Sequence, residues 1–343
     1  MRFPRVVLAL IAGSVLAAAS SPRRELVAAT DLDSGLLARP TAGGIRVEQP
    51  GRSPISILLP DGAQIAGLIP LHQGWMVAGT RPQEAGSELL LLQHRGAAQR
   101  DLPAPAERSG RWRTSPVAVT VGQRLQTLVW LEGDRRDAMA VRAARWLGDR
   151  WSPTETVSPV GRGSQLALAA TALADGEVLA VWSAFDGQDD EIFWSRTQGG
   201  RWSVPDRVAA DNAVPDITPT VTTLPGGALV AWSRYTPSGY ELVGARFDGT
   251  RWLADSPLRE PGTLFPSFAR SGGDLVLLCR RAGAAPGWAA LRLDGSGSVS
   301  ARTSVADPNE ERPSLSRTQA DAIRFLWNDR SVDGRWSAVL APR

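Results

Sequence analysis

The chain has 343 residues, of which 43% are hydrophobic, and it contains 34 glycines and 25 prolines. It has no lysine, so all 38 basic residues are arginines, and mechanisms that need a lysine nucleophile or Schiff base are excluded. The net charge is only +3 and the acids and bases are interspersed, whereas a nucleic-acid-binding domain usually carries a clustered basic face. We therefore expect no nucleic-acid partner.

The first 20 residues have the pattern of a signal peptide. Arg2 and Arg5 give a basic start, residues 6–19 are apolar, and residues 17–19 are small, as at a cleavage site. The apolar stretch is shorter than the roughly 20 residues that span a bilayer. We therefore expect a periplasmic or secreted monomer with no membrane span after cleavage. Residues 21–43 have a mixed composition and are predicted to form a lead-in segment.

Beyond this segment the sequence repeats about every 50 residues. An apolar run ends in tryptophan at Trp130, Trp182, Trp232 and Trp327, and two copies without tryptophan end at Gly79 and Leu278. A glycine turn repeats in step with it at residues 144–151, 195–202 and 245–252. A further strand-like segment precedes the apolar run and is often opened by proline, as at Pro116, Pro219, Pro266 and Pro313. Each unit therefore holds about four short strands.

Four strands per unit, six times over, predict an all-β fold: a six-bladed β-propeller of four-stranded antiparallel blades. A single propeller domain would span residues 44–343, with blades at about 60–106, 111–162, 163–212, 213–262, 263–308 and 309–343. The last unit has room for three strands only. We expect an N-terminal strand, either Gly44 to Gln49 or Ile55 to Leu59, to complete it and close the ring.

The repeated tryptophans are interpreted as packing residues. A strand between two blades is buried on both faces and reads as a continuous apolar run, as residues 179–182 do. Cys279 also lies in such a run and is expected to be a small buried thiol. As the only cysteine, it excludes an intramolecular disulfide.

The glycine turn at Ser195 to Trp202 resembles the Asp-box, or BNR repeat, of sialidase-like propellers, Ser-x-Asp-x-Gly-x-x-Trp. Ser195, Gly199 and Trp202 match this motif, but Thr197 replaces its aspartate. The resemblance covers the repeats from about residue 75 to 336. It implies a propeller in which the box is a turn between the third and fourth strands, on the side away from the ligand site.

An active sialidase would, by the same resemblance, have an Arg-Ile-Pro element, an arginine triad, a tyrosine nucleophile with a glutamate partner, and an aspartic acid. No Arg-Ile-Pro element occurs, and Tyr235 and Tyr240 are the only tyrosines. Tyr240 and Glu241 would point to opposite faces of a strand. The sequence therefore favours a non-catalytic protein, and an enzyme of this kind would be a glycoside hydrolase.

The candidate ligand-binding residues lie in loops that do not repeat. Arginine pairs with carboxylates through two hydrogen bonds, so arginine, acid and tyrosine side chains together could recognise a sugar carboxylate. The candidates within the units are Arg135, Arg136, Asp189, Asp190, Glu191, Arg234, Tyr235, Tyr240, Arg280, Arg281, Asp329 and Arg330. Connections between the units add Arg111, Arg113, Arg162, Asp211, Asp216, Glu310, Glu311 and Arg312. The alternative interpretation is a solvated charged rim.

The sequence has few residues that could form a metal site or a catalytic serine triad. His72 and His94 are the only histidines, too few for a histidine-rich metal site or for a usual serine triad. Residues 186–190 offer oxygen ligands for Ca²⁺ but lack the spacing of an EF-hand loop. A polar turn is the favoured interpretation there, and we expect no cofactor.

We therefore expect an exported, non-catalytic propeller that binds a glycan, or an envelope or extracellular protein, through its loops. Two alternatives stay open. One is a sialidase-like glycoside hydrolase with a diverged site, and the other is a periplasmic assembly scaffold.

Overall fold

The computed structural model describes residues 26–96, 98–105, 110–159, 167–210, 212–253, 258–307, 311–318 and 322–338. The predicted signal peptide lies outside these residues. The described chain forms β-strands and one short 3₁₀ helix, η1 (Leu32–Ser34), arranged as seven antiparallel sheets.

The sheets follow one another in chain order. The first holds β1 (Val27–Ala28), β2 (Leu37–Thr41), β3 (Gly44–Glu48) and β4 (Ile55–Leu58), and the second β5 (Gln64–Leu71), β6 (Gly74–Gln83), β7 (Gly86–Arg95) and β8 (Ala98–Asp101). The third holds β9 (Trp112–Val121), β10 (Arg124–Arg135), β11 (Ala138–Arg145) and β12 (Glu155–Thr156). The fourth holds β13 (Leu168–Ala172), β14 (Val178–Phe185), β15 (Asp190–Gln198), β16 (Arg201–Trp202) and β17 (Asp206–Arg207).

The remaining sheets use the C-terminal part of the chain. The fifth holds β18 (Asp216–Leu224), β19 (Gly227–Thr236), β20 (Gly239–Phe247) and β21 (Arg259–Pro261). The sixth holds β22 (Thr263–Ser271), β23 (Asp274–Arg281), β24 (Gly287–Leu293), β25 (Val299–Ala306) and β29 (Ser337–Ala338). The seventh holds β26 (Ser314–Arg317), β27 (Ala322–Leu326) and β28 (Ser331–Arg335).

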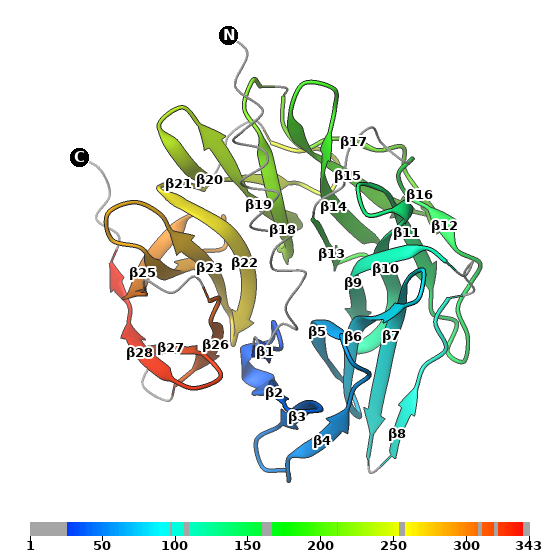
Figure 1. The fold of residues 1–343 in the computed structure, drawn as a ribbon. Coiled ribbons are helices and arrows are strands. Elements are labelled where there is room, and N and C mark those ends of the chain that lie inside the picture. Colours follow the sequence, from blue (N-terminus) through cyan, green and yellow to red (C-terminus); the bar gives the residue numbers. More distant parts are fainter. Residues whose placement is uncertain are drawn as a thin grey trace.

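The sheets form the blades of a propeller. Figure 1 shows them in a ring, with the first strand of each sheet, β1, β5, β9, β13, β18, β22 and β26, nearest the centre. Because neighbouring strands are antiparallel, the loop between the second and third strands lies at the same end of the ring as the connection to the next sheet. We call this end the loop face. The turns between the third and fourth strands lie at the opposite end.

The prediction of six blades closed by an N-terminal strand is wrong, because the structure has seven sheets. The two segments expected to close the ring are β3 and β4, which pair with each other in an additional first sheet, where β3 also pairs with β2. The β2–β3 hairpin joins residues adjacent in sequence, so its loop closes at little cost in chain entropy. The seventh sheet keeps three strands in the described chain, and β1 and β2 lie in the predicted lead-in segment.

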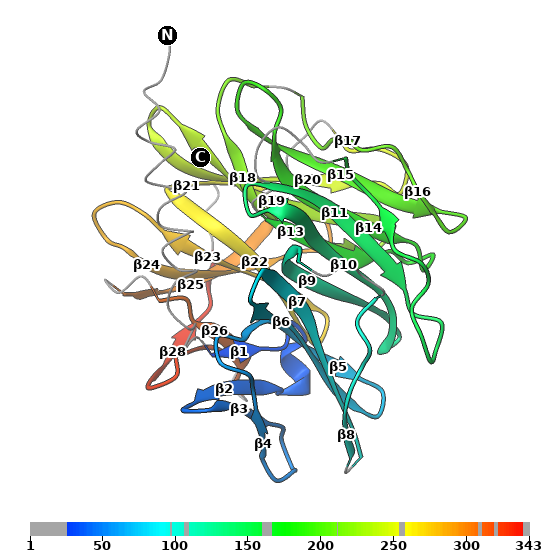
Figure 2. The ribbon, with the colours of Figure 1, turned by 45° about the vertical axis from the view of Figure 1, so that its right-hand side comes forward.

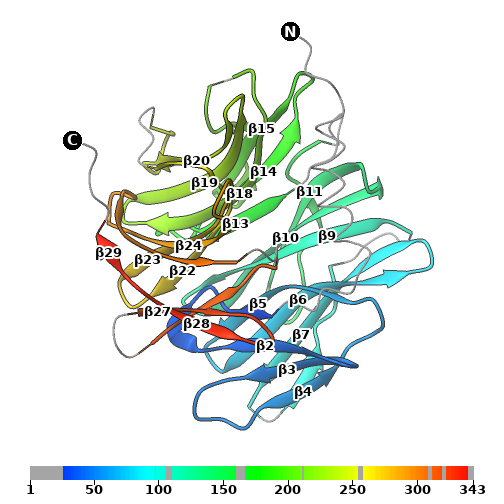
Figure 3. The same cartoon turned by 60° about the vertical axis from the view of Figure 1, so that its left-hand side comes forward.

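The ring closes through contacts between the first sheet and the last two, which lie side by side in Figure 3. The Ser314 hydroxyl on β26 accepts a hydrogen bond from the Ala28 amide at 3.1 Å and donates one to the Leu26 carbonyl at 2.9 Å. The segment around η1 also reaches the sixth sheet, where Asp33 accepts a hydrogen bond from the Ser271 hydroxyl at 3.0 Å. Closure therefore uses hydrogen bonds between sheets rather than a strand shared between the chain ends.

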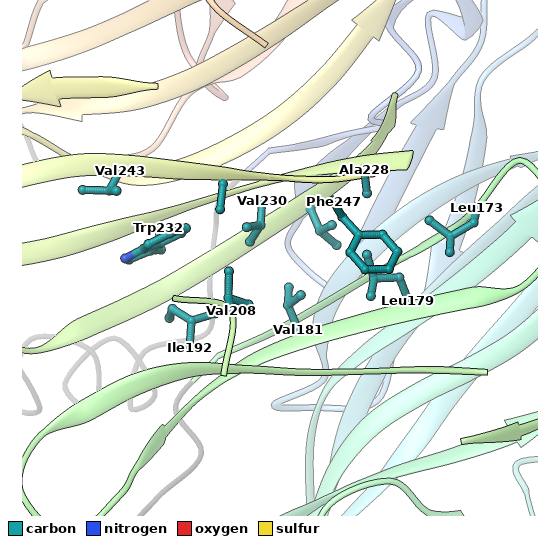
Figure 4. Close-up of a cluster of buried hydrophobic side chains, with 12 residues drawn as sticks. Leu173, Leu179, Val181, Ile192, Val208, Ala228, Val230, Trp232, Val243 and Phe247 are labelled. Atoms are coloured by element: carbon teal, nitrogen blue, oxygen red, sulfur yellow. The ribbon is translucent and has the colours of Figure 1, made fainter. Parts of the chain in front are cut away.

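The core lies between successive sheets. Six buried clusters of apolar residues fill the spaces from the first sheet to the seventh, and Figure 4 shows the one between the fourth and fifth. The repeated tryptophans Trp130, Trp182, Trp232 and Trp327 are at most 1% exposed in these clusters, which confirms that they are packing residues. Cys279 is likewise buried, and burial raises its pKa to about 12.

The turn that resembles an Asp-box joins β15 to β16 and lies away from the loop face. Gly199 in this turn has φ +55°, a conformation that glycine adopts at little cost. Thr197 replaces the motif's aspartate, and the Glu177 carboxylate accepts the Gly199 N–H at 3.0 Å and also bonds the Thr197 hydroxyl. A carboxylate from the neighbouring strand thus holds the turn.

Candidate ligand-binding site between the fourth and fifth sheets

An aspartate–arginine pair lies where β18 begins and β19 ends, at the loop face. Asp216 and Arg234 are direct partners in the β18–β19 register. The Arg234 guanidinium donates from Nε and Nη2 to the two Asp216 oxygens at 2.8 and 2.7 Å. The Asp216 side chain is 1% exposed, whereas that of Arg234 is 22% exposed. A buried carboxylate therefore fixes a guanidinium that still reaches the surface.

Asn212 connects this pair to a second acid, Glu191 on β15. Its side-chain amide lies 3.3 Å from Glu191 Oε1 and 3.2 Å from Asp216 Oδ2, and its backbone amide donates to Glu191 at 3.3 Å. Glu191 is 1% exposed. We call Asp190, Glu191, Asn212, Asp216 and Arg234 the carboxylate site.

Burial and mutual repulsion set the protonation of this site. Burial, and then the negative charge of Asp216, raises the pKa of Glu191 to about 8. Burial, and then the charges of Asp189 and Asp186, raises the pKa of Asp190 to about 6. At pH 7 Glu191 is therefore mainly protonated and can donate a hydrogen bond, while Asp190 is mainly ionised.

Asp186 and Arg207 extend the carboxylate site along the β14–β15 loop. Arg207 Nη2 lies 2.5 Å from an oxygen of Asp186, whose side chain is 5% exposed. The other Asp186 oxygen accepts the backbone amides of Gln188 at 2.7 Å and Asp189 at 3.2 Å. These two bonds form a polar turn at the sequence considered for Ca²⁺. The described residues contain no group of three or more His, Cys, Asp and Glu side chains that could hold a metal ion.

Two buried polar atoms near this end of the sheets have no hydrogen-bond partner among the described residues. They are Ser183 Oγ, in a residue that is 0% exposed, and Nε1 of Trp232, which is 1% exposed. Figure 4 shows the Trp232 nitrogen turned away from Phe247 and Leu173, which lie toward the opposite face. By contrast, Ser233 bonds the Thr218 hydroxyl and the Phe265 amide, each at 2.8 Å. Buried polar groups are rarely left without partners, so a water or ligand is expected here.

The two tyrosines lie on the β19–β20 hairpin, at the loop face. Tyr235 and Tyr240 are direct partners in the register, and their rings meet edge to face with centroids 5.3 Å apart. Both are partly exposed. Burial, and then Tyr235, raises the pKa of Tyr240, so this phenol stays protonated at neutral pH. Tyr235 follows Arg234 on β19, and Tyr240 precedes Glu241 on β20, so both rings leave the sheet on the face opposite to the Arg234 side chain.

The other predicted residues lie on different sheets. Arg135 pairs with Asp137, and Arg136 lies 3.9 Å above the Trp112 ring, both in the third sheet. Arg280 and Arg281 end β23 in the sixth sheet. In the seventh, Asp329 is exposed, while Arg330 bonds Asp307 at 2.8 Å and lies over Trp327. Arg162, Asp211 and Glu310 fall outside the described residues.

A second buried ion pair, within the third sheet and facing the second, serves as a comparison because its role is structural. Arg113 Nε lies 3.0 Å from Glu132, both side chains are under 8% exposed, and Arg113 also donates to the Ser87 carbonyl at 3.1 Å. Arg111 and Arg142 lie within 3.9 Å of the same glutamate, so bases outnumber acids around it. The carboxylate site differs: its acids, with Asp186 and Asp189 beside them, are five carboxyl groups that interact with the guanidinium groups of Arg207 and Arg234.

Sequence reasoning missed Asn212 as a site residue, and it missed the buried polar atoms of Ser183 and Trp232 at the same end of the sheets. The role of Asn212 could not be predicted from the sequence, because it depends on two acids that belong to different sheets. Ser183 had a usable signal: the Trp-Ser pair recurs at 182–183 and 232–233, within runs that are otherwise apolar. Trp232 is also a core residue, so its orphaned N–H is visible only in the structure.

Comparisons with known proteins show the fold. No protein-family model matches the chain, and no curated protein matches it. A protein of unknown function from Dyadobacter fermentans aligns over 83% of this chain and 98% of its own, with 12% identity and a TM-score of 0.53. The fungal lectin from Aleuria aurantia, described as a six-bladed propeller that recognises fucose, covers 81% of this chain and 92% of its own with 11% identity and a TM-score of 0.48.

An α-L-arabinofuranosidase from Podospora anserina covers 65% of this chain and 86% of its own with 13% identity and a TM-score of 0.39. At these identities the likeness concerns the fold alone. The chain is thus a β-propeller, and its seven sheets come from its own strand pairing. Because no protein-family model matches the chain, the resemblance to the sialidase-like family is not confirmed. Among the described residues, no helix has the length and hydropathy of a membrane span.

Proposed function

We propose that this protein is an exported propeller that binds a glycan at the carboxylate site. The observation that carries the proposal is the pair of buried acids, Glu191 and Asp216, joined by Asn212 behind the partly exposed Arg234. The buried acids fix the orientation of the groups that a ligand would touch. A polar site held in this way loses little conformational entropy on binding.

The chemistry of the accessible groups suits a polyhydroxylated ligand. Asp216 takes Nε and Nη2 of Arg234, which leaves Nη1 to donate to a sugar oxygen. Asn212 Oδ1 accepts the Val214 amide at 3.1 Å and keeps a second lone pair that can accept a sugar hydroxyl. The excess of carboxylates repels anions, so the site favours a neutral glycan over the sugar carboxylate considered from the sequence.

A glycan array tests the ligand class. The expected result is binding to a subset of neutral glycans, lost in Arg234→Gln and kept in Asp329→Asn, an exposed loop-face residue of another sheet. A parallel pull-down with envelope proteins tests the alternative partner. Binding of an envelope protein in the absence of any glycan signal would overturn the glycan proposal in favour of a protein-binding role.

A second function, glycoside hydrolysis, is favoured by one observation. Glu191 is protonated at neutral pH, while Asp216 is held by Arg234, so two neighbouring carboxyl groups differ in charge. Glycosidases use such a pair as general acid and as base or nucleophile. A panel of fluorogenic glycosides distinguishes this function: turnover that disappears in Glu191→Gln would establish it, and absence of turnover would leave binding alone.

A further inference from the structure

A cavity of about 350 Å³ lies between the first and second sheets, at the end of the ring opposite the loop face. It is formed by the end of β3 with the loop to β4, and by residues of β6 and β7. Figure 2 shows these two sheets as neighbours. Its volume falls at the lower end of the range for small-molecule pockets. None of its lining residues belongs to the carboxylate site.

One wall of the cavity is flat and apolar. Trp75 and His94 are direct partners in the β6–β7 register, and their rings stack with centroids 4.9 Å apart and planes 10° apart. Both side chains are buried, at 1% and 7% exposure. Ile55 continues this wall from β4. A planar or branched apolar group would find matching contacts there.

The facing wall is polar and carries one charge. Gln49, Arg52 and Ser53 line it from the β3–β4 loop, where the Arg52 amide donates to the Gln49 carbonyl at 3.2 Å. No carboxylate lines the cavity, and Arg52 forms no ion pair with the described acids. An arginine that pairs with none of the described acids, at the edge of an apolar cavity, favours an anionic ligand.

The pKa of His94 depends on its burial in the cavity wall and on the charge of Arg52. Burial, and then the Arg52 charge, lowers the pKa of His94, so its imidazole is neutral at pH 7. Its buried Nδ1 has no hydrogen-bond partner among the described residues. The imidazole ring of His94 therefore lines the cavity, and its pKa should respond to a change of charge at Arg52.

We propose that this cavity binds a small aromatic or branched monocarboxylate, whose carboxylate pairs with Arg52 while its apolar body packs against the Trp75–His94 stack. Inorganic phosphate would leave the apolar wall without contacts. An organic cation would be repelled by Arg52. A neutral ligand of the same shape would leave the guanidinium without a counter-ion.

The test uses benzoate as the probe and its neutral isostere benzyl alcohol as the control. The chain has two histidines, so imidazole NMR signals resolve His94 from His72, which is exposed on the β5–β6 turn. Benzoate should shift the His94 signals saturably, with a Kd of about 1 mM or tighter for a ligand of this size, and leave those of His72 unchanged. The bound carboxylate should also offset Arg52 and raise the pKa of His94.

Arg52→Gln is the matched variant, because the Arg52 side chain is exposed and holds no described partner, so the fold should be kept. It should weaken benzoate binding by about tenfold or more and leave the weaker binding of benzyl alcohol unchanged. The proposal is overturned if benzoate causes no saturable shift of His94, or if benzoate binds equally well to Arg52→Gln. Equal affinity for benzoate and benzyl alcohol in the unmodified protein would also overturn it.

Discussion

At the scale of single residues, the neighbours of each buried acid determine the charge and the hydrogen bonding of the carboxylate site. Asp216 is neutralised by two hydrogen bonds from Arg234. Glu191 shares Asn212 with Asp216 and lies in the field of that negative charge. Glu191 is therefore mainly protonated at neutral pH beside an Asp216 that is bonded to Arg234, although the sequence shows only an acidic loop and an acid in the next connection.

The raised pKa of Glu191 predicts a fall in stability at high pH. Its pKa is about 8 in the folded protein and has an ordinary value of 4.5, so the folded state binds the extra proton between these values. The free energy of unfolding therefore decreases as the pH rises from about 4.5 to about 8. Glu191→Gln should flatten this profile and be more stable than the unmodified protein above pH 8.

Denaturant unfolding between pH 4 and 9 measures this profile. Asp190→Asn serves as the companion variant, because the pKa of Asp190, about 6 against an ordinary 3.8, confines its effect to lower pH. Identical slopes for the unmodified protein and Glu191→Gln between pH 6 and 8 would show that Glu191 is ionised throughout this range, contrary to the prediction.

Breaking the Asp216–Arg234 pair should be costly. Asp216→Asn leaves Arg234 without its counter-ion in a mostly buried position, and such losses amount to about 3 kcal/mol. The exposed pair Arg135–Asp137 on the third sheet is the matched control. Asp137→Asn should leave the free energy of unfolding nearly unchanged. Equal effects of the two variants in denaturant unfolding would contradict a buried role for Asp216.

At the scale of elements, the second strand of each sheet carries the core. Trp182 on β14 is 1% exposed and stacks with Phe193 of β15, with ring centroids 6.5 Å apart. We expect Trp182→Ala to lower the free energy of unfolding by about 3–5 kcal/mol and to leave ligand affinity unchanged in the folded fraction. A large loss of affinity at an unchanged melting temperature would show that Trp182 binds ligand directly.

The junction between the first and seventh sheets should be the weakest part of the ring. β1 and β26 are short, at two and four residues, and mostly half-buried. Ser314→Ala removes both hydrogen bonds that join them and should cost about 1–2 kcal/mol. Hydrogen exchange of the Ala28 amide should accelerate, while Ser316→Ala, on the same strand, should not change it. Equal exchange in the two variants would exclude Ser314 as the closing contact.

The elements also show which parts of the fold the sequence could predict. An apolar run that ends in tryptophan is easily recognised as a repeat in the sequence. Four of the units can therefore be predicted from Trp130, Trp182, Trp232 and Trp327. The strands of the first sheet contain no tryptophan. In β2 only Leu37 and Ala38 are buried before Arg39 and Pro40, so the strand reads as a loop. Without β2, the sequences of β3 and β4 read as strands that close the ring.

At the scale of the whole molecule, the ring decides which loops meet. Arg234 on β19 and the acids of the β14–β15 loop lie on adjacent sheets and share a site, whereas Arg135 of the third sheet and Arg330 of the seventh have partners of their own. The sequence could predict that the charged residues lie in loops between repeats. It could not predict their grouping, because Asn212 and Asp216 enter the site only through the connection between two sheets.

Binding of a neutral glycan at the carboxylate site is the central claim, and isothermal titration of a glycan chosen from the array tests it most directly. Arg234→Gln should weaken binding by at least about tenfold, the loss expected for a hydrogen bond to a charged group. Arg135→Gln, an exposed arginine of the same face but another sheet, should bind like the unmodified protein. Unchanged affinity in Arg234→Gln, or an equal loss in both variants, would contradict the site.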